Sequence, residues 1–359
     1  MARIGIMTFL HNENCGSSLQ ALALQRTIRE LGHEPLGLDY RPDRAEQVRN
    51  LLRSHNSPAV VLDSMRRRQG HGERNTEGFD RFNRTELNLS PRCAGRRDLA
   101  RAAADCDVLL AGSDQVWSPE WLNPAYFFDF IAGKPRIAYA CSLGVRVAPG
   151  KAKEAMLRKL CAGFRQISVR EEEGKALLSG LLPGRTISVM PDPVFLRTRD
   201  DWTSLAGAPE TEDTLAAYFI KDDPAYPGRA AGLAAQTGLK LRPLAITPGM
   251  LALPDATPNP DPLAWLRALA ASSRVITDSF HGAAMAAILG KPLTIVRRWR
   301  DDDPQSKNSR IDQLMRQMGW DRDDDCRPSV DGAIRLDGLR ALGISWLRAA
   351  IGESLGAKA

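Results

Sequence analysis

Short apolar runs alternate along this chain with segments whose apolar residues recur every three or four positions. The run at residues 4–9 predicts a buried strand, and the leucines and isoleucine between residues 19 and 31 then share one helical face. Ser17 and Ser18 are the expected caps of that helix, and Gly32 is its expected end. The alternation continues, with strands expected at 35–40, 107–111, 136–141 and 167–169 and a helix at 98–104.

A second series of the same kind follows a polar stretch at residues 198–213. Strands are expected at 214–220, 240–246, 274–277 and 293–296, and helices at 228–236, 262–271, 282–289 and 310–318. An amphipathic helix is expected at 336–355. The alternation of strands and helices is typical of parallel α/β architecture. We therefore expect domains at 1–198 and 199–335, a C-terminal helix within 336–359, and a ligand cleft between the domains.

Composition narrows the class of protein without naming one. The chain has 359 residues, 43% of them hydrophobic, which excludes wholesale disorder, and its glycines and prolines show no fibrous period. The net charge of +6 permits an anionic ligand but does not argue for nucleic acid. The polar stretch at 66–75, which contains three consecutive arginines, is expected to be a surface loop.

Apolar stretches and cysteine spacing indicate the expected compartment and whether a metal site is expected. The longest apolar stretch, 282–296, is interrupted by Lys291 and Pro292, and the N-terminus fits a strand better than a signal peptide. Six cysteines are scattered without CxxC spacing, so neither a disulfide framework nor a zinc site is expected. We expect a cytoplasmic protein with no metal.

Two polar segments follow strands of the first series. Asn14 and Gly16 lie in a small-residue loop that leads into a helix, where backbone N–H groups favour an anion, although a plain helix cap explains the loop as well. Ser113, Asp114 and Gln115 follow an apolar strand and suit the recognition of sugar hydroxyls. The alternative there is a turn capped by Asp114. The spacing leaves both interpretations open.

Two further segments carry a cation at a strand end. Arg170 could bind phosphate or carboxylate through two hydrogen bonds, or it could pair with the glutamates that follow it at 171–173. His281 stands at a strand-to-helix corner, where N–H groups can hold an anion while the imidazole exchanges a proton. A structural histidine is the alternative.

Taken in order, these segments resemble the polysaccharide pyruvyl transferase family. The resemblance covers most of the chain. It is carried by residues 14–16, 112–117 (GSDQVW), 139–144, 168–171 (SVRE), 191–195 (PDPVF), 277–282 (TDSFHG) and 307–310. It implies an α/β fold of two facing Rossmann-like domains, similar to GT-B glycosyltransferases. It also implies transfer of pyruvate from phosphoenolpyruvate to two hydroxyls of a sugar, as a cyclic ketal, in polysaccharide biosynthesis.

The resemblance places roles on residues. Arg170 looks like the family arginine that grips the donor, and His281 like its essential histidine; we expect His281 to be the general acid and base. Phosphoenolpyruvate acts as a substrate, and no cofactor is expected. The acceptor is a sugar or a lipid-linked oligosaccharide, the latter requiring contact with a membrane surface. Donor contacts are expected from Ser279, Phe280, Gly282, Lys307 and Arg310, and acceptor contacts from Asn14, Gly16, Ser113, Asp114 and Gln115.

Two other functions remain open at this point. A GT-B glycosyltransferase with a nucleotide-sugar donor would share the fold and the cleft. A glycan- or nucleic-acid-binding protein without catalysis would use basic runs such as 66–68 and 297–300. Aspartates at 301–303 follow the second run directly, which favours a solvated mixed-charge loop instead.

Overall fold

The computed structural model describes residues 1–53, 75–145, 148–300, 303 and 306–356. In this part of the chain the first six strands form one sheet in the order β2-β1-β3-β4-β5-β6, with every neighbouring pair parallel. The inner strands are buried on both faces, which is why they are short apolar runs without alternation. The strands are β1 (Arg3–Met7), β2 (Glu34–Gly37), β3 (Val108–Ala111), β4 (Arg136–Cys141), β5 (Gln166–Val169) and β6 (Ile187–Val189).

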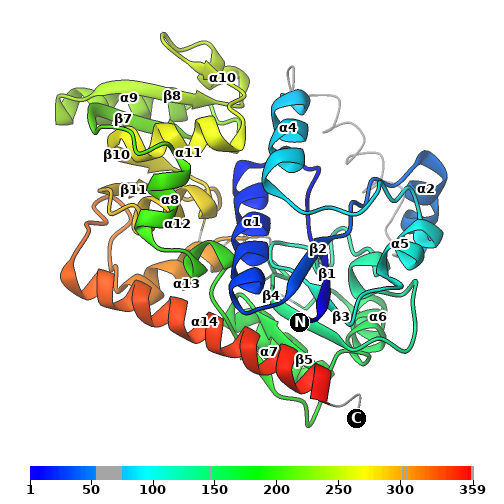
Figure 1. Ribbon diagram of the computed structural model, residues 1–359. Coiled ribbons are helices and arrows are strands. Elements are labelled where there is room, and N and C mark those ends of the chain that lie inside the picture. Colours follow the sequence, from blue (N-terminus) through cyan, green and yellow to red (C-terminus); the bar gives the residue numbers. More distant parts are fainter. Residues whose placement is uncertain (54–74, 146–147, 301–302, 304–305, 357–359) are drawn as a thin grey trace.

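Helices cover both faces of this sheet (Figure 1). Helix α1 (Cys15–Glu30) is buried along nearly its whole length, because it packs both on the first sheet and against the second half of the chain. The others are α2 (Arg44–Arg53), α4 (Thr76–Glu86), α5 (Arg96–Ala103), α6 (Lys151–Cys161) and α7 (Glu172–Leu181), with short 3₁₀ turns η1 (Pro124–Phe127) and η2 (Pro193–Leu196).

The second half repeats the design with a five-stranded parallel sheet in the order β11-β10-β7-β8-β9. Its strands are β7 (Glu212–Tyr218), β8 (Lys240–Ala245), β9 (Thr257–Pro258), β10 (Ser272–Thr277) and β11 (Leu293–Ile295). Its helices are α8 (Arg199–Leu205), α9 (Tyr226–Thr237), α10 (Pro248–Leu251), α11 (Pro262–Ala271), α12 (Phe280–Ile288) and α13 (Ser309–Met318).

The two halves share apolar packing. One cluster of buried side chains joins Leu19 and Leu22 of α1 to Trp265 of α11 and Val275 of β10. The C-terminal helix α14 (Val330–Gly356) runs along both halves and packs its Leu347 and neighbours beneath β3 and β4 (Figure 1). Burial of the cluster around α1 and α11, together with the packing of α14, therefore holds the two halves against each other.

Most of the expected strands and helices are present, with ends shifted by a few residues, and two expectations need correction. Asn14, rather than Ser17 or Ser18, caps α1, because its side chain accepts a hydrogen bond from the backbone N–H of Ser17 at 3.1 Å. The polar stretch after residue 198 is not a bare linker. It begins with α8, whose Thr198 and Asp201 form a reciprocal capping box.

Several other expectations concern absences or limits. The proposed domain boundary after residue 198 falls between β6 of the first sheet and β7 of the second. All six cysteines are free and buried. Within the described ranges, no helix is long and apolar enough to cross a membrane. The surface loop expected at 66–75 lies outside the described residues except for Asn75, which caps α4.

Candidate active site

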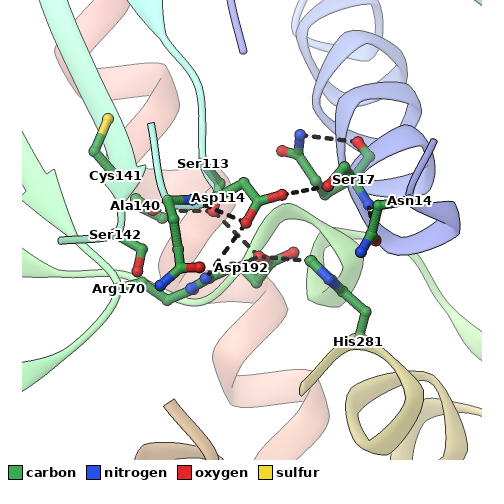
Figure 2. Close-up of polar contacts among 12 residues, drawn as sticks. Asn14, Ser17, Ser113, Asp114, Ala140, Cys141, Ser142, Arg170, Asp192 and His281 are labelled. Atoms are coloured by element: carbon green, nitrogen blue, oxygen red, sulfur yellow. Dashed lines mark hydrogen bonds and ion pairs between the residues drawn. The ribbon is translucent and has the colours of Figure 1, made fainter. Parts of the chain in front are cut away.

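The strand order reverses between β1 and β3 in the first sheet and between β7 and β10 in the second. Open parallel sheets bind ligands beyond the carboxyl ends of their strands at such points. Side chains that follow β1, β3, β5, β6 and β10 meet there in one buried group (Figure 2). The site thus draws on both halves of the chain.

Asp192, just after β6, is the centre of this group. It is 1% exposed, and its Oδ2 accepts hydrogen bonds from Arg170 and from the Ser113 hydroxyl at 3.1 Å. Its Oδ1 accepts the backbone N–H of Val194 at 3.1 Å, which caps η2. His281 Nε2 lies 3.5 Å from Oδ2 on the other side. Burial raises the pKa of Asp192, but the facing His281 and Arg170 outweigh it and hold that pKa well below its ordinary value.

Arg170 lies at the end of β5 and is 2% exposed. Besides Asp192, it has Glu171 at 3.6 Å and Asp114 at 3.8 Å, and its guanidinium stacks 4.5 Å from the ring of Phe280. In the described part of the chain, its Nε and Nη2 have no hydrogen-bond partner. A buried guanidinium with donors to spare can bind an anion through two parallel hydrogen bonds.

His281 lies in the first turn of α12, which Ser279 caps through a hydrogen bond from the backbone N–H of Gly282 at 3.3 Å. The imidazole packs directly on Gly16 at the start of α1. A Cβ atom at residue 16 would lie 2.1 to 2.3 Å from ring and Cβ atoms of His281. The N-termini of α1 and α12 therefore meet across the cleft, and only glycine leaves room for the histidine.

Asp114 carries the third buried carboxylate of the group. Its Oδ2 accepts a hydrogen bond from the Ser17 hydroxyl, and its Oδ1 accepts the backbone N–H of Gln115 at 2.8 Å. Burial raises its pKa, but His281 and Arg170 lower it further, so the net shift is downward. Asp114 has φ +71° and Ala140, in a bulge of β4, has φ +49°. Such left-handed conformations cost energy in residues with a Cβ and concentrate at functional sites.

A second cationic group lies beside Arg170. Arg298 Nε donates to the carbonyl oxygen of Asp278 at 2.9 Å and lies 3.2 Å from its carboxylate. Arg310, at the start of α13, is 8% exposed, and none of the residues that the structure describes forms an ion pair with it or accepts a hydrogen bond from its buried Nε. Burial together with Arg170 and Arg298 lowers the pKa of Arg310 to about 10. Phe280, Arg298, Lys307 and Arg310 line one small pocket.

The structure brings most of the residues singled out from sequence to this place. Asn14 and Gly16 form the start of α1, and Asp114 and Arg170 face each other. Ser113 is fully buried and holds Asp192. The remaining expected residues are the α12 start (Ser279, Phe280, His281, Gly282), Arg310, and Lys307, whose ammonium pairs with Glu120 at 2.6 Å and lies 4.7 Å from the Trp121 ring.

Three residues of the site were not assigned a role from sequence. Asp192 stands between prolines with no local sign of burial, and Glu171 entered only as an alternative ion-pair partner of Arg170. Glu171 does lie beside Arg170, at 3.6 Å, and burial raises its pKa. Arg298 was placed in a solvated loop; that expectation is wrong, because Asp278 holds its side chain against the wall of the small pocket. For Asp192 and Glu171, a position just after a strand was the one signal of a functional role that the sequence offered.

The family follows from the sequence as a whole. A model of the polysaccharide pyruvyl transferase family matches residues 14–299. The chain belongs to that family. Membership supports a transferase, and the matched range includes Asp114, Arg170, Asp192 and His281. No curated protein matches the chain.

Solved structures resemble the chain in fold. UDP-GlcNAc 2-epimerase from Neisseria meningitidis, bound to UDP-GlcNAc, is 10% identical with a TM-score of 0.50, over 98% of this chain and 100% of that one. AviGT4, a glycosyltransferase involved in avilamycin A biosynthesis, is 14% identical with a TM-score of 0.48, over 99% of each chain. At these identities the likeness concerns fold alone. The two parallel sheets confirm the expected pair of Rossmann-like α/β domains, and the epimerase shares this fold over its whole length.

The buried carboxylates of the site are held by arginine and serine side chains. Among the described residues, no group of three or more His, Cys, Asp or Glu side chains is placed to hold a metal ion. The side chains that hold the carboxylates are Arg170, Ser17, Ser113 and Ser142.

Proposed function

We propose that the protein transfers pyruvate from phosphoenolpyruvate to two hydroxyls of a sugar, forming a cyclic ketal in polysaccharide biosynthesis. The observation that carries this proposal is Arg310. Among the described residues no side chain forms an ion pair with this buried cation, and the charges of Glu171 and Asp114 offset its burial only in part, so an anion bound directly to it would stabilise it. Arg310 lies beside two more guanidinium groups, a concentration of positive charge that suits a ligand with several negative charges.

Phosphoenolpyruvate has that chemistry, since it carries a phosphate and a carboxylate on one small carbon frame. In the proposal, Arg310 and Arg170 bind these two groups, and the N-terminus of α12 adds the backbone N–H of its first turn. The ring of Phe280 stacks on the Arg170 guanidinium and holds it in one orientation. Lys307, held by Glu120 of the first half, closes the donor side of the pocket.

The reaction then needs an acid and a base at one position. His281 as imidazolium gives a proton to the methylene carbon of the donor, and C2 becomes electrophilic. The first sugar hydroxyl adds to C2 and returns its proton to His281. The C–O bond to phosphate breaks, the second hydroxyl adds to C2, and its proton leaves with the phosphate. Proton transfer by a positioned histidine typically contributes about 10² to 10⁴ in rate.

Asp192 is a positioning residue in this scheme. Its carboxylate lies 3.5 Å from Nε2 and fixes the orientation of the imidazole ring. Because Ser113 and Arg170 hold the carboxylate from the opposite side, it cannot turn away. Asp114, Asn14 and Gln115 lie on the first half and are proposed to receive the sugar, so residues 1–198 form the acceptor side, while residues 199–335 together with Arg170 form the donor side.

The experiment is mass spectrometry of the surface glycan from cells with and without this gene. The account predicts that the repeat unit of deleted cells is lighter by the mass of pyruvate minus water, and that the gene restores it. The variant His281→Gln, nearly the same size, should not restore it while folding normally. An unchanged glycan after deletion would contradict the proposal. Stabilisation of the purified protein by UDP, with none by phosphoenolpyruvate, would favour a nucleotide-sugar transferase instead.

A further inference from the structure

A second pocket lies at the opposite end of the helix that carries His281. Its volume is about 570 Å³, within the range of small-molecule sites. Its walls come from the C-terminal end of α12, from η2, from the end of α13 and from the first turns of α14. The apolar lining includes Phe195, Ile288, Met318, Trp320 and Leu336.

Two cations in this pocket lack counter-charges. Lys291 is 8% exposed, and its ammonium forms no ion pair or hydrogen bond with any residue that the structure describes. Arg199 lies beside it and packs on Gly290, where a Cβ would lie 3.1 Å from the Arg199 Nη1 atom. Burial, and then the charge of Arg199, lowers the pKa of Lys291. Two neighbouring cations, one of them on a nearly buried side chain, repel each other, and an anion bound between them would relieve that repulsion.

The remaining charges of the pocket are already matched. Arg197 pairs with Glu30 and with Asp201 at 3.0 Å, and Arg340 binds Asp337 at 2.9 Å. The positive charge open to a ligand therefore belongs to Lys291 and Arg199.

We propose that this pocket binds an amphipathic anion, with a phosphate or carboxylate against Lys291 and Arg199 and an apolar body against Trp320, Met318 and Leu336. Val330 also lines the pocket and is 78% exposed. It therefore offers an apolar contact to a ligand whose hydrocarbon chain extends out of the pocket. The ligand would touch α12 and η2, the elements next to His281 and Asp192, without touching either residue. This site does not depend on the proposed reaction.

Isothermal titration of the full-length protein tests it with three probes: octyl phosphate, inorganic phosphate and 1-octanol. Octyl phosphate should bind more tightly than inorganic phosphate or 1-octanol. Lys291→Met should weaken that binding by at least about tenfold. Lys240→Met, the same change at an exposed lysine of β8, should leave it unchanged. Because Lys291 has no partner to lose, its variant should unfold at the same denaturant concentration as the parent or a higher one.

Equal affinity for octyl phosphate and inorganic phosphate, or unchanged binding in Lys291→Met, would overturn the proposal. If Lys291→Met does not fold, the exposed Arg199→Gln takes its place, with the same expected loss. Vesicles of phosphatidylcholine with and without phosphatidic acid identify the source of the ligand. Binding that needs phosphatidic acid and Lys291 indicates a membrane lipid, and binding of octyl phosphate alone indicates a soluble metabolite. If the protein binds neither octyl phosphate nor vesicles with phosphatidic acid, the proposal is wrong.

Discussion

At the residue scale, the active site rather than helix stability requires glycine at position 16. Alanine normally stabilises a helix by about 0.5–1 kcal/mol over glycine. Here the added Cβ would lie 2.1 to 2.3 Å from atoms of His281. We predict that Gly16→Ala lowers the rate of phosphate release from phosphoenolpyruvate by about 10² or more, because it displaces the imidazole from Asp192.

A matched control lies in α9, where Gly232 has nothing within 4 Å of its ideal Cβ. Gly232→Ala should keep full activity and raise the free energy of unfolding by up to about 1 kcal/mol. If Gly16→Ala were as active as the parent, His281 would not need its present position.

Asp192 predicts a pH dependence of stability. Its pKa and that of Asp114 are lower in the folded chain than the ordinary value near 3.9. Their contribution to stability is therefore complete above that value and is lost as pH falls through the folded pKa. Asp192→Asn should make the thermal midpoint fall less steeply between about pH 5 and pH 2 than in the parent.

The exposed Asp255, paired with Lys240 at the surface, provides the comparison. Asp255→Asn should keep the parent's slope. Parallel pH curves for Asp192→Asn and the parent would mean that the Asp192 carboxylate carries no such linkage.

Individual site residues could be predicted from sequence only as far as their place at strand ends. That rule selected Asp114, Arg170 and His281. It could not show that Asp192 joins two of them, because its partners Arg170 and His281 come from β5 and α12 and meet only in three dimensions. For the same reason Arg298 was assigned to solvent, since the carboxylate that holds it lies at residue 278.

At the scale of elements, the last helix returns from the second half to complete the first. Leu347 of α14 is fully buried in a cluster with Ile4 and Ile6 of β1. We predict that Leu347→Ala lowers the free energy of unfolding by roughly 2–5 kcal/mol, through lost burial and a cavity. Leu342→Ala, on the same helix but 48% exposed, should cost less than about 1 kcal/mol. Urea unfolding of both variants measures the difference, and equal losses would contradict this packing.

Elements with strong apolar patterns were predictable, and short or polar ones were not. The run at 262–271 was expected as a helix and is α11. The three-residue strand β6 gives too brief a pattern to recognise. Helix α8 is largely polar, and its capping box was the only local signal of a helix start. Whether a segment is a helix or a strand could thus be predicted from its hydrophobic periodicity. The order in which the strands pair could not, because it depends on contacts across the whole sheet.

At the scale of the molecule, the site depends on the apolar cluster that joins the two halves. Arg170 and Asp192 belong to the first half, and His281 and Arg310 to the second. The apolar cluster around α1 and α11 fixes their distances. Two facing α/β domains were predictable from the repeated alternation. The shared core was not, because residues buried between halves have the same sequence pattern as residues buried within one.

The buried guanidinium of Arg310 is proposed to bind a multiply charged anion. Titration calorimetry with phosphoenolpyruvate tests it directly on the parent, on Arg310→Met and on Arg316→Met, a matched control at an exposed arginine of the same helix. The account predicts that the parent and Arg316→Met bind equally, and that Arg310→Met binds at least about tenfold more weakly without loss of stability. Phosphoenolpyruvate binding of equal strength in Arg310→Met and the parent would contradict it.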